Sequence, residues 1–280
     1  MVDRHNRFSI AAAACGLALT LAAPAHAAGE SPWVEDSHSA LRLIGGNNAS
    51  GATSLRAGIQ LRLEPGWHTY WRYPGDSGVP PRFSFPGSDN VASVKVLYPA
   101  PHAYSDEAGV IIGYKGGVIF PLRVVARDKS KPVTLHLKAE YAICDKLCVP
   151  VEAQAQLTLT GATAESDALL ASAEAHVPKE ISAAAVGLKA HIASDHKVKP
   201  LVFVDLKAPT GKPIEIFVEG PTAEWALPIP KPAPGAPAGH QYFGFELDGL
   251  PPGVNPRGAY ELTFTIVGDG QPVEAKTHLD

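Results

Sequence analysis

The chain of 280 residues has few residues of the kinds that bind soft metals, and it has no long apolar run beyond its N-terminal segment. It contains three cysteines and one methionine, and because that methionine is the initiator, it leaves no methionine ligand for copper. Beyond the N-terminal segment no run approaches about 18 apolar residues, so no retained membrane span is expected. The net charge of −4 gives no electrostatic reason to expect a nucleic-acid partner. Glycine and proline are abundant instead, at 26 residues each, which favours short strands and turns over long helices.

Residues 1–27 have the composition of a secretory signal peptide. Arginines precede the apolar run 8–23, and small residues occupy the two positions that signal peptidase reads before Ala28. We therefore expect cleavage after Ala27 and a periplasmic mature protein without Cys15. A lipoprotein anchor at Cys15 is the alternative, but the apolar run continues well past that residue.

Short apolar runs alternate with Gly, Pro, Asn and Asp along the mature chain. Period-2 alternation between such turn residues predicts β-strands. The expected strands are residues 55–63, 91–98, 118–125, 133–141, 153–159, 201–206, 214–218, 242–247 and 260–267. The segment between Tyr73 and Pro86 is rich in proline and glycine, so it is expected to be a loop and no part of a central strand.

The spacing of apolar residues departs from the alternation of a strand in one segment, the Ala- and Glu-rich residues 163–177. It begins with a Thr or Ser cap and stops at Pro178, which predicts one helix that connects two β-domains or caps the edge of one. The predicted fold class is therefore all-β, with two β-sandwich domains joined by a short helix. The predicted boundaries are a signal peptide at 1–27, a first sandwich with the cysteine pair at 28–162, a helical connector at 163–190 and a second sandwich at 191–280.

Cys144 and Cys148 are the cysteines that remain after signal cleavage. They are the group of residues in the sequence with the clearest chemical reactivity. An exported protein meets an oxidising environment, so the pair is expected to be oxidised at least part of the time. Four residues of extended strand span about 13 Å, whereas a disulfide needs its Cα atoms within about 7 Å. Residues 145–147 must therefore turn the chain if the pair bonds.

Three interpretations of this pair stay open from the residues alone. A redox role is favoured because a tight loop is reduced more easily than a relaxed one, and because Lys146 favours a thiolate, although Asp145 opposes it. A structural staple across so short a loop contributes roughly 2 kcal/mol. A zinc site would need two histidines, and none has finger-like spacing to the cysteines. No metal and no organic cofactor is expected.

The segment 65–78 is also unusual, because it contains four aromatic residues within seven consecutive positions. They are Trp67, Tyr70, Trp71 and Tyr73. Core packing of at least two of them is expected, because Trp and Tyr bury large areas. The alternative is an aromatic rim that shields a reactive site or stacks on a sugar. The competing function is thus a periplasmic β-sandwich module that binds carbohydrate or protein and has a purely structural disulfide.

Three stretches of the chain carry a resemblance to a known family. They are GWHTYWRYPGDSGVPP at 66–81, IGYKGGVIFPL at 112–122 and AEYAICDKLCVPVEAQ at 139–154. Together they resemble the periplasmic N-terminal domain of the thiol:disulfide interchange protein DsbD, most closely in its ScsB-like, disulfide bond corrector branch. The resemblance covers roughly residues 40–160, and the helix and second β-domain match the longer N-terminal region of the ScsB-like branch.

The resemblance implies an immunoglobulin-like sandwich that acts as a thiol-disulfide oxidoreductase without NAD or flavin. Cys148 would form the mixed disulfide with partners, and Cys144 would resolve it. The implied electron source is a separate membrane conduit of the DsbD or CcdA type or a thioredoxin-like donor, since the sequence ends without either part. The implied acceptors are periplasmic thioredoxin-fold proteins. An adaptor in cytochrome c maturation or copper stress would keep this chemistry and change only the client.

Several other residues are expected to shield or neighbour the disulfide. They are His68, Tyr70, Tyr104, Asp106, Glu107, Gly109, Tyr141 and Lys146. In the family that the chain resembles, a cap loop covers the disulfide, and Asp106, Glu107 and Gly109 correspond to positions near that loop. The aromatic residue of that loop is missing here. Ala108 stands close to its place, and Tyr104 is the nearest substitute.

Overall fold

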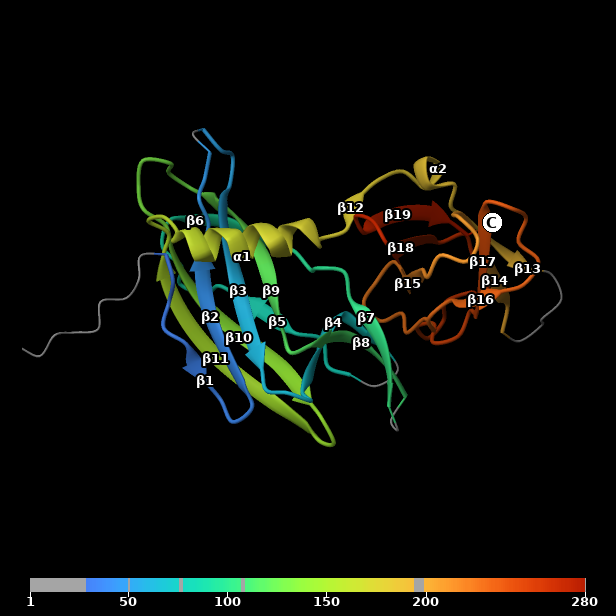
Figure 1. Cartoon of the computed structure of the whole chain (residues 1–280), viewed down its shortest axis with the longest axis horizontal. Helices are drawn as coiled ribbons and strands as arrows, with labels where there is room; N and C mark the ends of the chain where they lie inside the picture. Colours follow the sequence, from blue (N-terminus) through green and yellow to red (C-terminus); the bar gives the residue numbers. More distant parts are fainter. Residues whose placement is uncertain (1–28, 50, 76–77, 107–108, 194–198, 280) are drawn as a thin grey trace, which may run out of the picture.

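The computed structural model describes residues 29–49, 51–75, 78–106, 109–193 and 199–279 (Figure 1). They form an all-β, immunoglobulin-like fold in which two sandwiches lie one after the other along the long axis of the molecule. We call them the N-terminal sandwich (β1 to β11) and the C-terminal sandwich (β12 to β19). The predicted fold class is confirmed, whereas the predicted domain boundaries stay a prediction. The predicted signal peptide and Cys15 lie outside the described residues.

Two sheets form the N-terminal sandwich. One has the strand order β1-β2-β3-β9-β6, and the other has the order β11-β10-β4-β8-β7 with β5 paired to β10. Alternate side chains of both sheets meet in one core, as their period of two requires. The strands are β1 (Val34–Glu35), β2 (Ser39–Gly45), β3 (Leu55–Leu63), β4 (His68–Gly75), β5 (Arg82–Ser84), β6 (Val91–Val96), β7 (His102–Asp106), β8 (Gly109–Lys115), β9 (Gly117–Ala126), β10 (Thr134–Cys144) and β11 (Cys148–Thr158).

The C-terminal sandwich has a separate core between two four-stranded sheets. Their strand orders are β12-β19-β18-β15 and β13-β14-β17-β16. Val204, Phe243 and Phe264 are among the fully buried side chains between them. The strands are β12 (Lys179–Glu180), β13 (Lys189–Ala193), β14 (Leu201–Lys207), β15 (Glu215–Glu219), β16 (Lys231–Ala233), β17 (His240–Glu246), β18 (Glu261–Val267) and β19 (Val273–His278).

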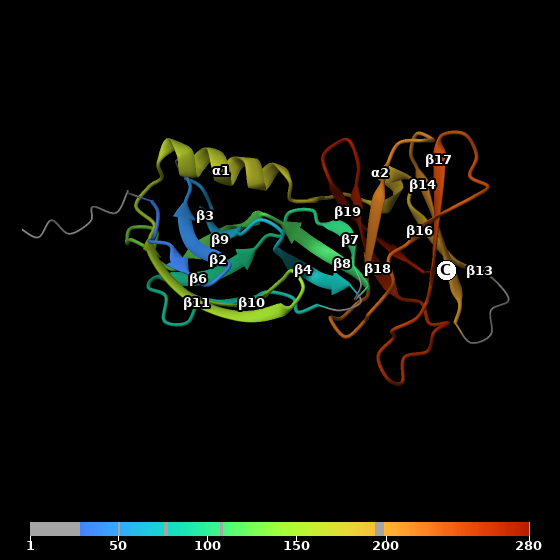
Figure 2. The ribbon, with the colours of Figure 1, turned by 60° about the horizontal axis from the view of Figure 1, so that its bottom comes forward.

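The predicted helix over 163–177 is confirmed as α1 (Ala164–Ala175), and a single turn, α2 (Ala183–Val186), follows it. Thr163 caps α1 through a reciprocal pair of hydrogen bonds with Ser166, which explains where the helix begins. The helix lies along the first sheet of the N-terminal sandwich (Figure 2) and buries Leu170 against it. In the described part of the chain, no helix is long and apolar enough to cross a membrane.

Glu174 anchors the last turn of α1 to the sheet. Its carboxylate accepts hydrogen bonds from Arg56, at 2.7 Å from Nη2, and from Arg123. Burial raises the pKa of Glu174, but these two arginines outweigh burial and the pKa is lowered. A lowered pKa contributes stability that is present above the ordinary value of 4.5 and is lost as the pH falls through the folded-state pKa.

We therefore expect Glu174→Gln to reduce the free energy of unfolding by about 1 kcal/mol at neutral pH, where the carboxylate is charged. The same variant should lose less stability than the wild type between about pH 5 and pH 3, because it has no carboxylate to protonate. Urea unfolding at several pH values measures both effects. An acid dependence as steep as that of the wild type would contradict this role for Glu174.

The segment that begins at Tyr73 departs from the loop prediction. Strand β4 continues to Gly75 and lies between β10 and β8, inside the second sheet. The register of β4 against β8 shifts between Tyr70 and Gly75, so Pro74 falls at an irregularity where the regular ladder is interrupted. Proline is tolerated in this strand for that reason.

Candidate functional site

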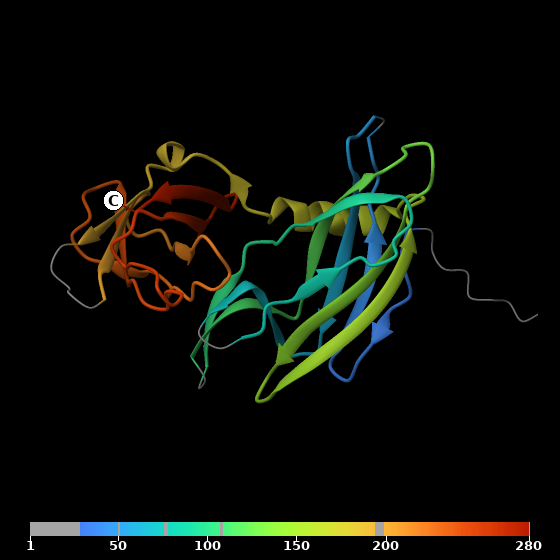
Figure 3. The same cartoon turned by 180° about the vertical axis from the view of Figure 1, so that it is seen from behind.

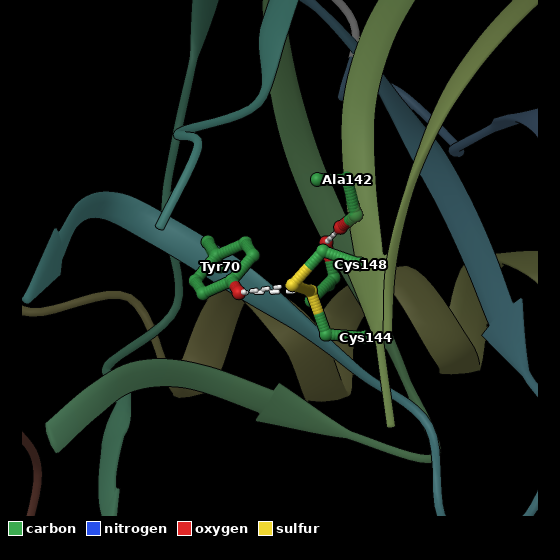
Figure 4. The surroundings of a disulfide bond; sticks show 5 residues. Tyr70, Ala142, Cys144 and Cys148 are labelled. Carbon is green, nitrogen blue, oxygen red and sulfur yellow. Dashed lines mark hydrogen bonds between the residues drawn. A yellow bond between two sulfur atoms is a disulfide. The ribbon is translucent and has the colours of Figure 1, made fainter. Parts of the chain in front are cut away.

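A hairpin between β10 and β11 brings the two cysteines together. Cys144 ends β10 and Cys148 begins β11, and the two residues face each other in the register with Cα atoms 4.2 Å apart. Residues 145–147 turn the chain, with the amide of Asp145 donating to the carbonyl of Leu147 at 3.3 Å. The two sulfur atoms form a disulfide (Figure 4). The predicted turn is confirmed, and the bond joins neighbouring strands at the tip of the long hairpin seen in Figure 3.

The two cysteines differ in exposure. Cys144 is 2% exposed, whereas Cys148 is an exposed residue. Leu147, next to Cys148 in the turn, has 78% of its surface exposed. Thiol–disulfide exchange depends on which sulfur an incoming thiolate can reach. Cys148 is therefore the accessible sulfur and Cys144 the protected one.

Tyr70 covers the disulfide from the neighbouring strand β4. Its hydroxyl lies 2.9 Å from Cys144 Sγ and 3.4 Å from Cys148 Sγ (Figure 4). Disulfide sulfurs carry no proton, so the tyrosine hydroxyl is the donor. The chain also passes closely over the ring at Gly78, where a Cβ atom would lie 2.6 Å from Tyr70 Cδ1 and Cε1. A side chain at position 78 would clash with the ring, so glycine permits this approach, and Tyr70 contacts both Gly78 and the disulfide.

A small apolar cluster separate from the main core surrounds the buried sulfur. Tyr70, Ile111, Ala142 and Cys144 form it, and Tyr104 packs against it. Ala142 precedes Cys144 by two residues, so the alternation of β10 places both on one face of the sheet. The cluster therefore encloses Cys144 and leaves Cys148 at its border.

The side chain of Tyr141 lies on the face of β10 opposite to this cluster. It is buried in the main core, where its hydroxyl lies 2.9 Å from Ser39 Oγ. The expectation that Tyr141 neighbours the disulfide is therefore wrong. Consecutive residues of a strand point to opposite faces, so Ala142 faces the disulfide cluster and Tyr141 faces the main core. Lys146 is exposed in the turn between the cysteines.

His68 is a direct strand neighbour of Cys144, because the two residues are paired in the register of β4 and β10. It is buried, and its ring meets that of Tyr70 edge-on with centroids 5.6 Å apart. Thr69, which follows it, donates a 2.8 Å hydrogen bond from Oγ1 to the carbonyl of Ala142 and ties β4 to β10 beside the disulfide.

The hairpin of β7 and β8 contains the residues expected in a cap loop. Asp106 and Gly109 are paired at the end of this hairpin, and Glu107 and Ala108 lie outside the described residues. Tyr104 stands on β7 against the disulfide cluster. Burial raises the pKa of the Tyr104 hydroxyl, and a nearby carboxylate raises it further, so the phenol stays protonated at neutral pH.

The aromatic segment does not form a sugar-binding platform. Trp71 is 0% exposed and Tyr70 is 2% exposed, and Trp67 is stacked on His38 with ring centroids 4.1 Å apart. The prediction that at least two of these residues pack inside is confirmed. A module that stacks a carbohydrate on Trp67, Tyr70 and Trp71 is contradicted by this burial.

The sequence predictions missed some of the residues that build the site. Ile111 and Ala142 were not selected, although the period-2 pattern before Cys144 could have indicated Ala142. Gly78 lies in the stretch 66–81 that carries the resemblance, but its contact with Tyr70 depends on the path of the loop, which sequence spacing does not give.

Residues 46–160 match the family model described as the N-terminal region of thiol:disulfide interchange protein DsbD. These residues form a DsbD N-terminal-like domain. The chain also resembles the crystal structure of the N-terminal periplasmic domain of ScsB from Proteus mirabilis, with a TM-score of 0.71 and 19% sequence identity. That likeness covers 90% of this chain and 99% of the other, and at such identity it shows the shared fold. A search of curated proteins gives no significant match.

The stated resemblance is therefore confirmed for the DsbD N-terminal-like domain. The disulfide of Cys144 and Cys148 lies inside the matched range. The family and the cysteine pair together indicate a role in thiol–disulfide exchange in general.

Proposed function

We propose that the chain is a periplasmic thiol–disulfide oxidoreductase that passes reducing equivalents through Cys144 and Cys148 to thioredoxin-fold proteins. The observation that carries the proposal is the asymmetry of the pair: one sulfur is exposed and the other is enclosed with a tyrosine hydroxyl. A purely structural staple needs no such difference. An exchange site needs one accessible sulfur for its partner and one protected sulfur for resolution.

The reaction proceeds in two displacements. The thiolate of Cys148 attacks the disulfide of the acceptor, a mixed disulfide forms, and the second acceptor sulfur leaves as a thiolate that takes up a proton. The thiolate of Cys144 then attacks Cys148 Sγ, closes the internal disulfide and releases the first acceptor sulfur, the one that Cys148 had attacked, as a thiolate that also takes up a proton. Two electrons pass to the acceptor, which ends as a dithiol. Tyr70 is placed to donate a hydrogen bond to Cys144 Sγ when that sulfur carries negative charge.

The proposal includes an external source of electrons. A membrane conduit of the DsbD or CcdA type, or a thioredoxin-like donor, would reduce the disulfide by the reverse of these steps. The predicted signal peptide and the periplasmic origin of the ScsB domain support a periplasmic setting. Roles in cytochrome c maturation or copper stress would differ in the identity of the acceptor and use the same two cysteines.

Trapping the mixed disulfide tests this function. We expect reduced Cys144→Ser protein to capture an oxidised thioredoxin-fold partner through Cys148, because the resolving thiol is missing. The matched variant Cys148→Ser retains only the enclosed sulfur and should capture at least about tenfold less. Non-reducing electrophoresis and mass spectrometry of the linked peptides measure both. Equal capture by the two variants, or none by either, would refute the proposed roles.

A further inference from the structure

One face of strand β15 forms part of the contact between the C-terminal sandwich and the N-terminal one. Ile216 and Val218 point into the C-terminal core, whereas Phe217 belongs to the core of the N-terminal sandwich. Glu215 and Glu219 share the face of Phe217 because side chains alternate along a strand. This face therefore presents one aromatic ring between two carboxylates to the sandwich that carries the disulfide.

Glu215 binds the outer edge of β7. Its carboxylate lies 2.9 Å from His102 Nδ1 and accepts a hydrogen bond from the amide of Ala103 at 3.0 Å. Among the residues that the structure describes, strand β7 is the last strand of its sheet and has β8 as its only ladder partner. An edge strand presents unpaired amide groups, and Glu215 satisfies one of them. Figures 1 and 2 show β7 at the side of the N-terminal sandwich that faces the C-terminal one.

Tyr104 is the residue of β7 that faces the disulfide cluster, and it follows Ala103 directly. It packs against the cluster that encloses Cys144, and the ammonium of Lys115 lies 4.2 Å from the centroid of its ring. The same Glu215 carboxylate is close enough to raise the pKa of Tyr104. The position of this aromatic ring thus depends on a strand that is paired on one side and held by Glu215 on the other.

Strand β4 is held from the same face of β15. Arg72, two residues after Tyr70, donates hydrogen bonds to Glu219 at 2.6 and 2.9 Å. Both tyrosines of the disulfide cluster therefore have a contact with β15 within two residues along their strands. The C-terminal sandwich thus reaches the surroundings of the disulfide through these two strands.

We propose that Glu215 is a positioning residue, which holds β7 so that Tyr104 keeps Cys144 enclosed and leaves Cys148 as the reactive sulfur. This role rests on the proposed function, because it explains why Cys148 and not Cys144 reacts with the partner. It assigns the C-terminal sandwich a part in that selectivity. Loss of Glu215 should loosen β7, expose Cys144 and reduce the difference between the two thiols.

Alkylation of the reduced full-length protein tests this inference without any partner protein. Iodoacetamide modification of Cys144 and Cys148 is followed by mass spectrometry, and the ratio of the two rates is the readout. In Glu215→Ala we expect the Cys144 rate to rise about fivefold while the Cys148 rate stays within about twofold, because local opening affects the enclosed sulfur. Glu215→Gln should restore most of the selectivity, because its amide oxygen still accepts the Ala103 hydrogen bond.

Two further variants make the result decisive. Glu261→Ala removes an exposed carboxylate of the same sandwich that pairs with Lys276 at 3.7 Å, and it should keep the wild-type ratio. His102→Ala removes one exposed partner of Glu215 and should shift the ratio in the same direction by about twofold. An unchanged ratio in folded Glu215→Ala overturns the inference, and if that variant does not fold, an unchanged ratio in His102→Ala does so. Failure of the trapping experiment would refute exchange with thioredoxin-fold proteins and leave this ratio measurable.

Discussion

Replacement of Arg72 by alanine is expected to lower the free energy of unfolding by about 3 kcal/mol, because it leaves two carboxylates without their cation between the sandwiches. Arg72 pairs with Glu219 at 2.6 Å and also with Glu274. Burial lowers the pKa of Arg72, but the hydrogen bonds and charges of these two glutamates outweigh burial and raise the pKa. The three side chains are between 15% and 29% exposed, which places the expected loss at the lower end of the range for buried pairs.

The origin of this loss can be tested with further variants. If the cost comes from the carboxylates left behind, Arg72→Ala combined with Glu219→Gln and Glu274→Gln should recover a large part of it. Lys212→Ala is the matched control, because Lys212 and Asp269 form an ion pair that is 60% exposed on both sides. That control should leave the urea midpoint unchanged. A midpoint of Arg72→Ala equal to that of the control would contradict a structural role for the inter-sandwich ion pairs.

The alternation of apolar and polar residues predicted the regular strands with one buried face. It missed strands whose position depends on pairing with a neighbouring strand. The alternation of residues 55–63 gives β3 with its observed ends, because one face of that strand packs in the core. Strand β4 was not among the predicted strands, and its end beyond Tyr73 fell in the predicted loop, because the register shift that accommodates Pro74 is a property of two strands. Strand β7 lies at the edge of its sheet in the described part of the chain, and the amide of its Ala103 donates to Glu215, which is 112 residues away.

The chemistry of the candidate site was predictable from the cysteine spacing, but its asymmetry was not. The separation of four positions from Cys144 to Cys148 required a turn, and the structure has one. Which sulfur is enclosed depends on the register of β4 against β10 and on the packing of Tyr70, and sequence spacing contains neither. Tyr70 and Tyr104 pack beside the buried sulfur, and Tyr104 is the residue that the sequence indicated as the nearest substitute for an aromatic residue of a cap loop.

Replacement of Tyr70 by phenylalanine is expected to slow thiol attack on the oxidised protein about tenfold, which corresponds to about 1.4 kcal/mol of transition-state stabilisation. Attack at the exposed Cys148 expels Cys144 Sγ as a thiolate, and the Tyr70 hydroxyl lies 2.9 Å from that sulfur. A hydrogen bond to a developing anion is stronger than one to a neutral disulfide, so its loss slows the step. The same loss makes the reduced form less stable and should lower the reduction potential by about 30 mV.

Tyr141→Phe provides the matched control for this prediction. Tyr141 lies on β10, which pairs with the strand of Tyr70. It is also buried and also has a hydroxyl hydrogen bond, but it faces the main core and Ser39. Both variants should lose about 1 kcal/mol of stability, since each loses one buried hydrogen bond. Only Tyr70→Phe should change the rate of reduction by dithiothreitol and the equilibrium with glutathione. If the two variants have equal rates and potentials, Tyr70 contributes packing alone, and stabilisation of the departing Cys144 sulfur must come from another group.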